Sequence, residues 1–124
     1  MPRILIIEDN EENRQALARR LKRRGYDVVL ANDGQQGIES AKSERPDLIL
    51  MDMNMPVLDG WQASQLIRAN PLTQDLPIIG LTAHALAGDR EKALQAGCSE
   101  YHTKPVDFSR LIVQIEALIK KGSS

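Results

Sequence analysis

The sequence contains few aromatic residues, a single cysteine and no excess of charge of either sign. Its 124 residues include one Trp, two Tyr and one Phe, which is too few for the stacking surfaces that bind single-stranded nucleic acid. The net charge of −1 argues against non-specific nucleic-acid binding by the whole chain, because such binding needs a large excess of Lys and Arg. Cys98 has no second cysteine with which to form an intramolecular disulfide, and this favours a reducing compartment.

Long hydrophobic runs are also missing. The longest unbroken apolar runs have four residues, whereas a membrane-spanning helix needs about 20. The apolar stretch that follows Met1-Pro2-Arg3 ends at Glu8, so it is too short for the hydrophobic region of a signal peptide. We therefore expect a cytoplasmic protein that does not contact the membrane.

Short apolar runs alternate along the chain with longer polar segments of helical character. Runs without polar alternation are typical of strands that are buried on both faces of a parallel sheet. In the last helical segment apolar residues recur at helical spacing, and Asp107 is placed to cap its start. Strands are predicted at 4–7, 28–31, 48–51, 78–81 and 100–103, and helices at 11–24, 33–44, 59–69, 84–96 and 108–121.

Five strand–helix units predict one α/β domain over residues 1–121, followed by a flexible tail at 122–124. Right-handed crossovers then favour a flavodoxin-like fold, a five-stranded parallel sheet in the order 2-1-3-4-5 with helices on both faces. In such a sheet ligands bind beyond the carboxyl ends of the strands, at the switch point between strands 1 and 3.

Polar residues directly follow four of the predicted strands. Glu8 and Asp9 follow the first, Asp52 the third, Thr82 the fourth and Lys104 the fifth. Any one of them alone is typical of an ordinary loop residue. Because the carboxyl ends of parallel strands meet at one edge of the sheet, we expect all of them to lie close together.

This set of side chains has a specific chemistry. Neighbouring carboxylates repel one another unless a cation joins them, and oxygen ligands suit Mg²⁺. Asp52, which ends the central strand, is the best candidate for a nucleophile of the aspartyl-phosphate type. The ammonium of Lys104 and the hydroxyl of Thr82 could neutralise and bind the oxygens of an incoming phosphoryl group.

Four motifs resemble those of a known family. They are Glu8-Asp9, Asp52 to Pro56 with Asp59-Gly60, Leu81-Thr82-Ala83, and Tyr101 to Pro105. In this order and spacing they resemble the receiver domain of response regulators in two-component and phosphorelay signalling, of the single-domain, chemotaxis-regulator type. The resemblance covers residues 3 to about 120, and the four motifs together are specific although each alone is weak.

The resemblance implies a phosphoacceptor site. Asp52 would accept a phosphoryl group from the phosphohistidine of a histidine kinase or of a histidine phosphotransfer protein. Thr82 and Lys104 would bind the phosphoryl oxygens, and the Lys104–Pro105 peptide would be cis. Four oxygen donors would hold Mg²⁺: the carboxylates of Glu8, Asp9 and Asp52 and the backbone carbonyl of Asn54.

The resemblance also implies a switch. On phosphorylation Thr82 and then Tyr101 would move inward, which would change the surface of the fourth helix and fifth strand and so alter the binding of a downstream protein partner. Asn54 and His84 lie two residues after the acceptor and two after the threonine, where the family tunes the loss of the phosphoryl group. We expect a monomer or a weak phosphorylation-dependent dimer, with no direct DNA binding.

Other functions fit the sequence less well. A phosphatase of the haloacid dehalogenase type also uses an aspartyl nucleophile with Mg²⁺, but it usually needs a general acid two residues later, where this chain has Asn54. A nucleotide- or flavin-binding module would need glycines in the first strand-to-helix turn. A receiver that has lost phosphorylation is a further alternative, but every residue that the chemistry requires is present. The prediction is therefore a phosphoacceptor with self-catalysed phosphorylation and dephosphorylation, and not an enzyme.

Several features depart from the common pattern of the family or stand apart from it. Glu8 replaces a more frequent Asp, so Asp9 is the safer metal ligand. His102 is interpreted as a hydrogen-bonded strand histidine. The basic segment 19–24 favours docking of the phosphoryl donor over nucleic acid. Met1 leads almost directly into the first strand, which favours a complete regulator, whereas Gly122-Ser123-Ser124 also permits a receiver excised from a hybrid kinase. Because five units use nearly all of the chain, we expect output through protein contacts.

Overall fold

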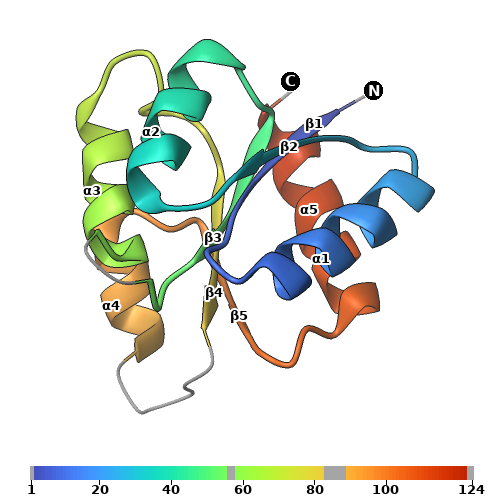
Figure 1. Ribbon diagram of the computed structural model, residues 1–124. Helices are drawn as coiled ribbons and strands as arrows, with labels where there is room; N and C mark the ends of the chain where they lie inside the picture. The colour runs from blue at the N-terminus through green and yellow to red at the C-terminus, as the bar shows by residue number, and fades with distance from the viewer. Residues whose placement is uncertain (1, 56–57, 83–88, 123–124) are drawn as a thin grey trace.

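The computed structural model describes residues 2–55, 58–82 and 89–122, which form a parallel sheet covered by helices on both faces (Figure 1). The strands are β1 (Arg3–Ile7), β2 (Asp27–Ala31), β3 (Leu48–Asp52), β4 (Ile78–Thr82) and β5 (Glu100–Thr103). The helices are α1 (Glu11–Arg23), α2 (Gly34–Ser43), α3 (Gly60–Ala69), α4 (Asp89–Ala96) and α5 (Phe108–Gly122). The strand order β2-β1-β3-β4-β5, with every pair parallel, confirms the predicted fold class.

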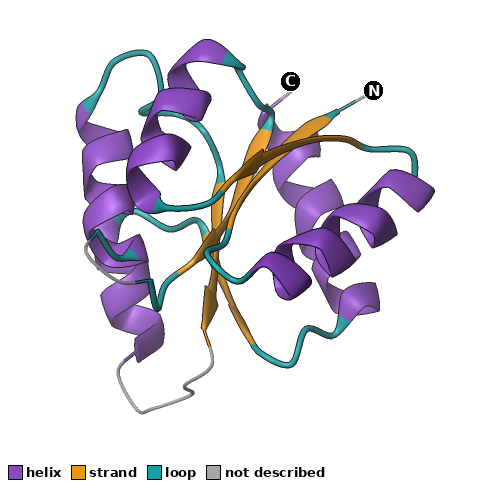
Figure 2. Cartoon of the chain, in the orientation of Figure 1, coloured by secondary structure: helices purple, strands orange, loops and turns teal. Residues whose placement is uncertain are grey.

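Two layers of helices enclose the sheet (Figure 2). Helices α2, α3 and α4 lie on one face, and α1 and α5 lie on the other. Because successive side chains of a strand point to opposite faces, Leu5 and Ile7 belong to the first hydrophobic cluster, and Ile4 and Ile6 belong to the second. All four side chains are fully buried. Burial on both faces explains why the strands stand in the sequence as unbroken apolar runs.

Side-chain caps fix where the helices begin. The side chains of Asn10, Asp33 and Asp59 each accept a hydrogen bond from the backbone N–H three residues further on, at the start of α1, α2 and α3. The carboxylate of Asp107 accepts a hydrogen bond from Arg110 N at 3.2 Å, which confirms the predicted cap of α5. These caps satisfy backbone donors that have no partner inside the helix.

Two predicted elements run beyond the described residues. The fourth helix is predicted from residue 84, and α4 begins at Asp89, directly after a segment, 83–88, that is not described. The last helix extends through Gly122, where the flexible tail is predicted to begin, and residues 123–124 of that tail are not described. None of the helices within the described ranges is both long enough and apolar enough to cross a membrane.

Helix α3 contacts α4 near one end and the turn that follows α4 near its other end. In the first turn of α3 the ring of Trp61 lies under the ammonium of Lys92 of α4, with 4.7 Å from Nζ to the ring centroid. In the last turn the guanidinium of Arg68 donates to the Gly97 carbonyl oxygen at 2.8 Å and to Ser99 Oγ at 3.3 Å. Arg68 therefore ties α3 to the turn that leads from α4 into β5.

The register of the strands places the polar residues at one edge. Ile7 of β1 pairs with Met51 of β3, so the residues that follow these two, Glu8 and Asp52, stand side by side. The last residue of β4, Thr82, lies one step beyond the partner of Asp52, because Asp52 pairs with Leu81. The sheet thus presents these groups on neighbouring strands at its carboxyl edge.

The backbone of Gly60, at the start of α3, lies close to the backbone of Met53 and Asp52, and a substitution can test this packing. Gly60→Ala is expected to lower the free energy of unfolding by about 1–3 kcal/mol, because an added Cβ would lie 2.6 Å from Met53 Cα and 2.8 Å from the Asp52 carbonyl oxygen. Urea unfolding measures the change. The control Gln65→Ala, on the exposed side of the same helix, should stay within about 0.5 kcal/mol of the native value. A Gly60→Ala variant as stable as the native protein would contradict the close approach.

Candidate functional site

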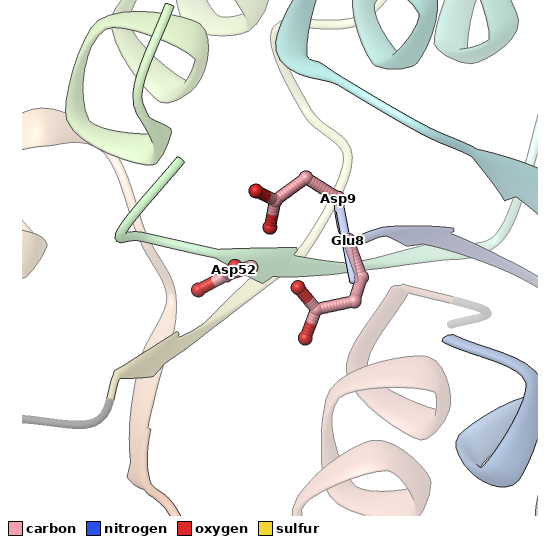
Figure 3. Close-up of side chains that lie close together, drawn as sticks. All are labelled: Glu8, Asp9 and Asp52. Atoms are coloured by element: carbon pink, nitrogen blue, oxygen red, sulfur yellow. The ribbon is translucent and has the colours of Figure 1, made fainter. Parts of the chain in front are cut away.

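Three carboxylates meet at the carboxyl edge of the sheet (Figure 3). Glu8 and Asp9 follow β1 and Asp52 ends β3, and one oxygen of each lies within 4.8 Å of the other two. Glu8 and Asp52 are only 4% and 3% exposed, whereas Asp9 is exposed. A donor set made only of oxygens, open to solvent on one side, fits Mg²⁺, which keeps several of its waters in proteins.

Lys104 brings a positive charge to this cluster from the end of β5. Its Nζ lies 2.8 Å from Glu8 Oε1 and 3.6 Å from Asp52 Oδ1. Glu8 and Lys104 are 96 positions apart in the sequence, and the fold makes them an ion pair. The Lys104–Pro105 peptide is cis, the isomer that the family resemblance implies.

Asn54 links the loop after Asp52 to strand β4. Its backbone N–H donates to Asp52 Oδ1 at 3.1 Å, and its side-chain Oδ1 accepts a hydrogen bond from Thr82 Oγ1 at 3.0 Å. Thr82 is 1% exposed, so its hydroxyl lies in the interior beside the cluster. The side-chain contact of Asn54 is not predicted from the sequence, which points only to its backbone carbonyl and its place in the loop.

The ionisation of Glu8 is strongly perturbed. Burial, followed by the nearby Asp52 carboxylate, raises the pKa of Glu8 from 4.5 to about 7 in spite of the opposing effect of Lys104. For Lys104, burial lowers the pKa, but the hydrogen bond to Glu8 and the charge of Asp52 outweigh it and raise the pKa overall. The lysine therefore stays charged, and the cluster has excess negative charge that a further cation would neutralise.

Arg14 is a member of the site that the sequence analysis missed. Its Nη1 donates to the Glu8 carbonyl oxygen at 2.9 Å, and the residue is only 9% exposed. It shares the buried side of α1 with Leu17, Ala18 and Leu21. These positions follow the three- and four-residue spacing of a helix face, so periodicity could have identified Arg14 as a buried cation.

The remaining predicted residues lie in three different settings. Tyr101 of β5 is 9% exposed and packs in the hydrophobic cluster on the side of α2, α3 and α4. His102 is buried, accepts a hydrogen bond from Asp107 N at Nε2, and donates from Nδ1 to Gln114 Oε1 at 2.9 Å. It is thus the hydrogen-bonded strand histidine that is predicted. His84 lies outside the described residues.

Comparison with known proteins identifies the family. Residues 4–116 match the family model of the response regulator receiver domain. The chain therefore belongs to the response regulator receiver domain family, and it is a module of two-component signalling.

Individual relatives agree with this assignment. The response regulator DivK of Brucella anthropi is 32% identical over 120 residues, covering 96% of this chain and 98% of its own length. The transcriptional regulatory protein PrrA of Mycobacterium tuberculosis is 36% identical over 123 residues, or 99% of this chain, and the chain spans about half (52%) of its length. The solved receiver domain of the sensor histidine kinase PA1611 of Pseudomonas aeruginosa is 44% identical, with a TM-score of 0.88 over 96% of this chain and 98% of that one.

The raised pKa of Glu8 predicts an unusual dependence of stability on pH. The folded protein holds a proton on Glu8 up to about pH 7, whereas the unfolded chain loses it near 4.5. Between these values the folded state binds more protons, so this group makes the protein less stable as pH rises. Relative to Glu8→Gln, which does not titrate, the native protein should lose on the order of 2 kcal/mol between pH 5 and pH 8.

Urea unfolding of both proteins, in buffers that contain a chelator, measures this difference. The chelator is needed because a divalent cation would favour the ionised carboxylate. The prediction is wrong if the free energy of unfolding of the native protein, relative to that of Glu8→Gln, stays constant or increases from pH 5 to pH 8. Either result would mean that Lys104 keeps the pKa of Glu8 low.

Proposed function

We propose that Asp52 is the phosphoacceptor of this receiver domain. The observation that carries the proposal is the position of its buried carboxylate, which lies among oxygen donors within 4.8 Å and 3.6 Å from the ammonium of Lys104. A carboxylate oxygen of Asp52 attacks the phosphorus of a phosphohistidine. A P–O bond forms, the P–N bond breaks, and the imidazole leaves with the electron pair and takes up a proton.

Lys104 and Thr82 bind the phosphoryl oxygens during this transfer. Lys104 needs only to change partners, because its ammonium already lies between Glu8 and Asp52. Thr82 ends β4 beside the acceptor and offers a hydroxyl donor. Both groups stabilise the charge on the transferring phosphoryl group, and this is the main catalytic contribution that a protein makes to such a reaction.

Four oxygen donors would hold Mg²⁺: the carboxylates of Glu8, Asp9 and Asp52 and the backbone carbonyl of Asn54. The all-oxygen set on this chain supports this assignment, as does the related PA1611 receiver domain, which carries a magnesium ion in its active-site cleft. When bound, the ion neutralises phosphoryl oxygens and aligns the acceptor with its donor. Asp9 is the exposed member of the set, so it is the carboxylate that is open to solvent.

The family membership leaves the phosphatase alternative without support. Position 54 offers an amide where that chemistry needs a general acid. The receiver instead catalyses its own phosphorylation by the donor and its own dephosphorylation. Asn54 and His84 tune the rate at which the phosphoryl group is lost. We further propose a cytoplasmic location, since the thiol of Cys98 is free and buried and so suits a reducing compartment.

The signal to the downstream partner depends on Thr82 and Tyr101. When Thr82 moves toward the phosphoryl group, the ring of Tyr101 on β5 repacks, and the surface formed by α4 and β5 changes its affinity for a downstream protein. This is a two-state element biased by one dianionic group. The domain acts as a monomer or a weak phosphorylation-dependent dimer, without direct contact to DNA.

A groove beside the site offers a place for the phosphoryl donor. It has a volume of about 610 Å³ and lies between α1 and the loop that leads into α5, with Glu8 and Lys104 at its inner end. Its wall includes Ala16 and Val106, and at its rim the guanidinium of Arg20 lies 4.3 Å from the ring centroid of Phe108. A helix that carries the phosphohistidine of a histidine kinase or phosphotransfer protein could lie here and face Asp52.

The acceptor assignment is tested with a small phosphodonor. Acetyl phosphate with Mg²⁺ should add one alkali-labile phosphoryl group to the native protein and none to Asp52→Asn, as measured by intact mass. Asp33→Asn, which changes another loop carboxylate at the same edge to an amide and keeps a good helix cap, should be labelled like the native protein. Labelling of Asp52→Asn would refute the assignment of Asp52 as the acceptor. Sustained release of phosphate from unrelated phosphomonoesters would instead support the phosphatase alternative.

The docking groove is tested by placing a charge in its wall. Ala16→Glu should slow phosphotransfer from a phosphohistidine protein about tenfold or more relative to labelling by acetyl phosphate, because the new carboxylate is desolvated on docking. Gln15→Glu adds the same charge one residue earlier, outside this groove, and should change that ratio less than about twofold. Equal effects of the two variants would contradict the proposal that the phosphoryl donor docks in this groove.

A further inference from the structure

The hydrogen bond between Thr82 and Asn54 joins two residues to which the proposed reaction gives separate tasks. Thr82 Oγ1 lies 3.0 Å from Asn54 Oδ1 and donates to it. Asn54 is anchored in turn by its backbone N–H, which donates to Asp52 Oδ1 at 3.1 Å. The threonine hydroxyl is buried, whereas Asn54 is exposed. The contact therefore places an exposed loop side chain over an interior hydroxyl.

We propose that the side chain of Asn54 is a brake on the switch, because it holds the Thr82 hydroxyl in its resting position. The inference rests on the proposed function, in which Thr82 donates to a phosphoryl oxygen on Asp52. A hydroxyl has one proton to donate, so it cannot serve Asn54 Oδ1 and the phosphoryl oxygen together. Activation is then an exchange of acceptors, and the free energy of the Thr82–Asn54 hydrogen bond opposes it.

This role is separate from the other two that are assigned to Asn54. The backbone carbonyl that would bind Mg²⁺ is present in every substitution at this position. Tuning of phosphoryl loss is a kinetic effect on an attacking water, whereas a brake changes the equilibrium between resting and active states before any hydrolysis. Asn54 is thus a positioning residue that acts through Thr82 and sets how much of the domain is active at a given level of phosphorylation.

The test uses beryllofluoride, which bonds to the acceptor carboxylate and stands in for the phosphoryl group. In the presence of Mg²⁺, Asn54→Ala should bind beryllofluoride about two- to tenfold more tightly than the native protein, because the hydrogen bond to Asn54 no longer has to be broken when the hydroxyl moves. Without beryllofluoride, the amide resonances of β4 and β5 in Asn54→Ala should shift part of the way toward their positions in the bound native protein.

Thr82→Val supplies the matched background, since valine keeps the shape of threonine and lacks the hydroxyl. In Thr82→Val the further change Asn54→Ala should leave the beryllofluoride affinity unchanged, because the brake has nothing to hold. Weaker or unaltered binding in the single variant Asn54→Ala, or an equal gain in the Thr82→Val background, would overturn the brake. If the native protein forms no beryllofluoride adduct, the proposal that Asp52 is the acceptor is wrong. This outcome differs from the outcomes that overturn the brake, so the two proposals can fail separately.

Discussion

The repulsion among three carboxylates is the constraint on which the rest of the site depends. Glu8, Asp9 and Asp52 are held within 4.8 Å of one another by the pairing of β1 with β3, so the free energy of the sheet opposes their separation. Lys104 offsets part of this repulsion from β5. The cluster keeps an excess of negative charge, which a bound cation would offset. The pKa of Glu8 is raised to about 7 mainly by burial, and the neighbouring Asp52 carboxylate adds to this effect.

A well-packed scaffold makes such an unfavourable cluster possible. The central strands have fully buried side chains on both faces. This burial stabilises the fold and offsets the unfavourable free energy of the carboxylate cluster. The site residues stand at the ends of these strands or one step beyond them, so the sheet fixes the position of their backbone. Rigid placement with exchangeable contacts is what a switch requires, because only small displacements are then needed to move between two arrangements.

The sequence predicts the strands and the residues at the strand ends because these follow from local patterns. The sheet order follows from the common arrangement of five strand–helix units. Buried strands are continuous apolar runs, and topology brings Glu8 and Lys104 together across 96 positions. The contacts that the sequence does not predict depend on side-chain geometry. The hydrogen bond from Thr82 to Asn54 needs a particular rotamer, and Arg68 reaches the carbonyl of Gly97 from the far end of a long side chain. Arg14 is the exception, since its place on the buried face of α1 follows the helical period.

The contact between α3 and α4 gives the protein an optical property. Trp61 is the chain's single tryptophan, and the ammonium of Lys92 lies over its ring. The attraction of a cation to the face of an indole depends steeply on distance and is strongest when both are shielded from water. Any displacement of α4 relative to α3 therefore changes the electrostatic field at the indole. The molecule thus carries an intrinsic emission probe beside α4, and movement of this helix can be followed in solution without attaching a dye.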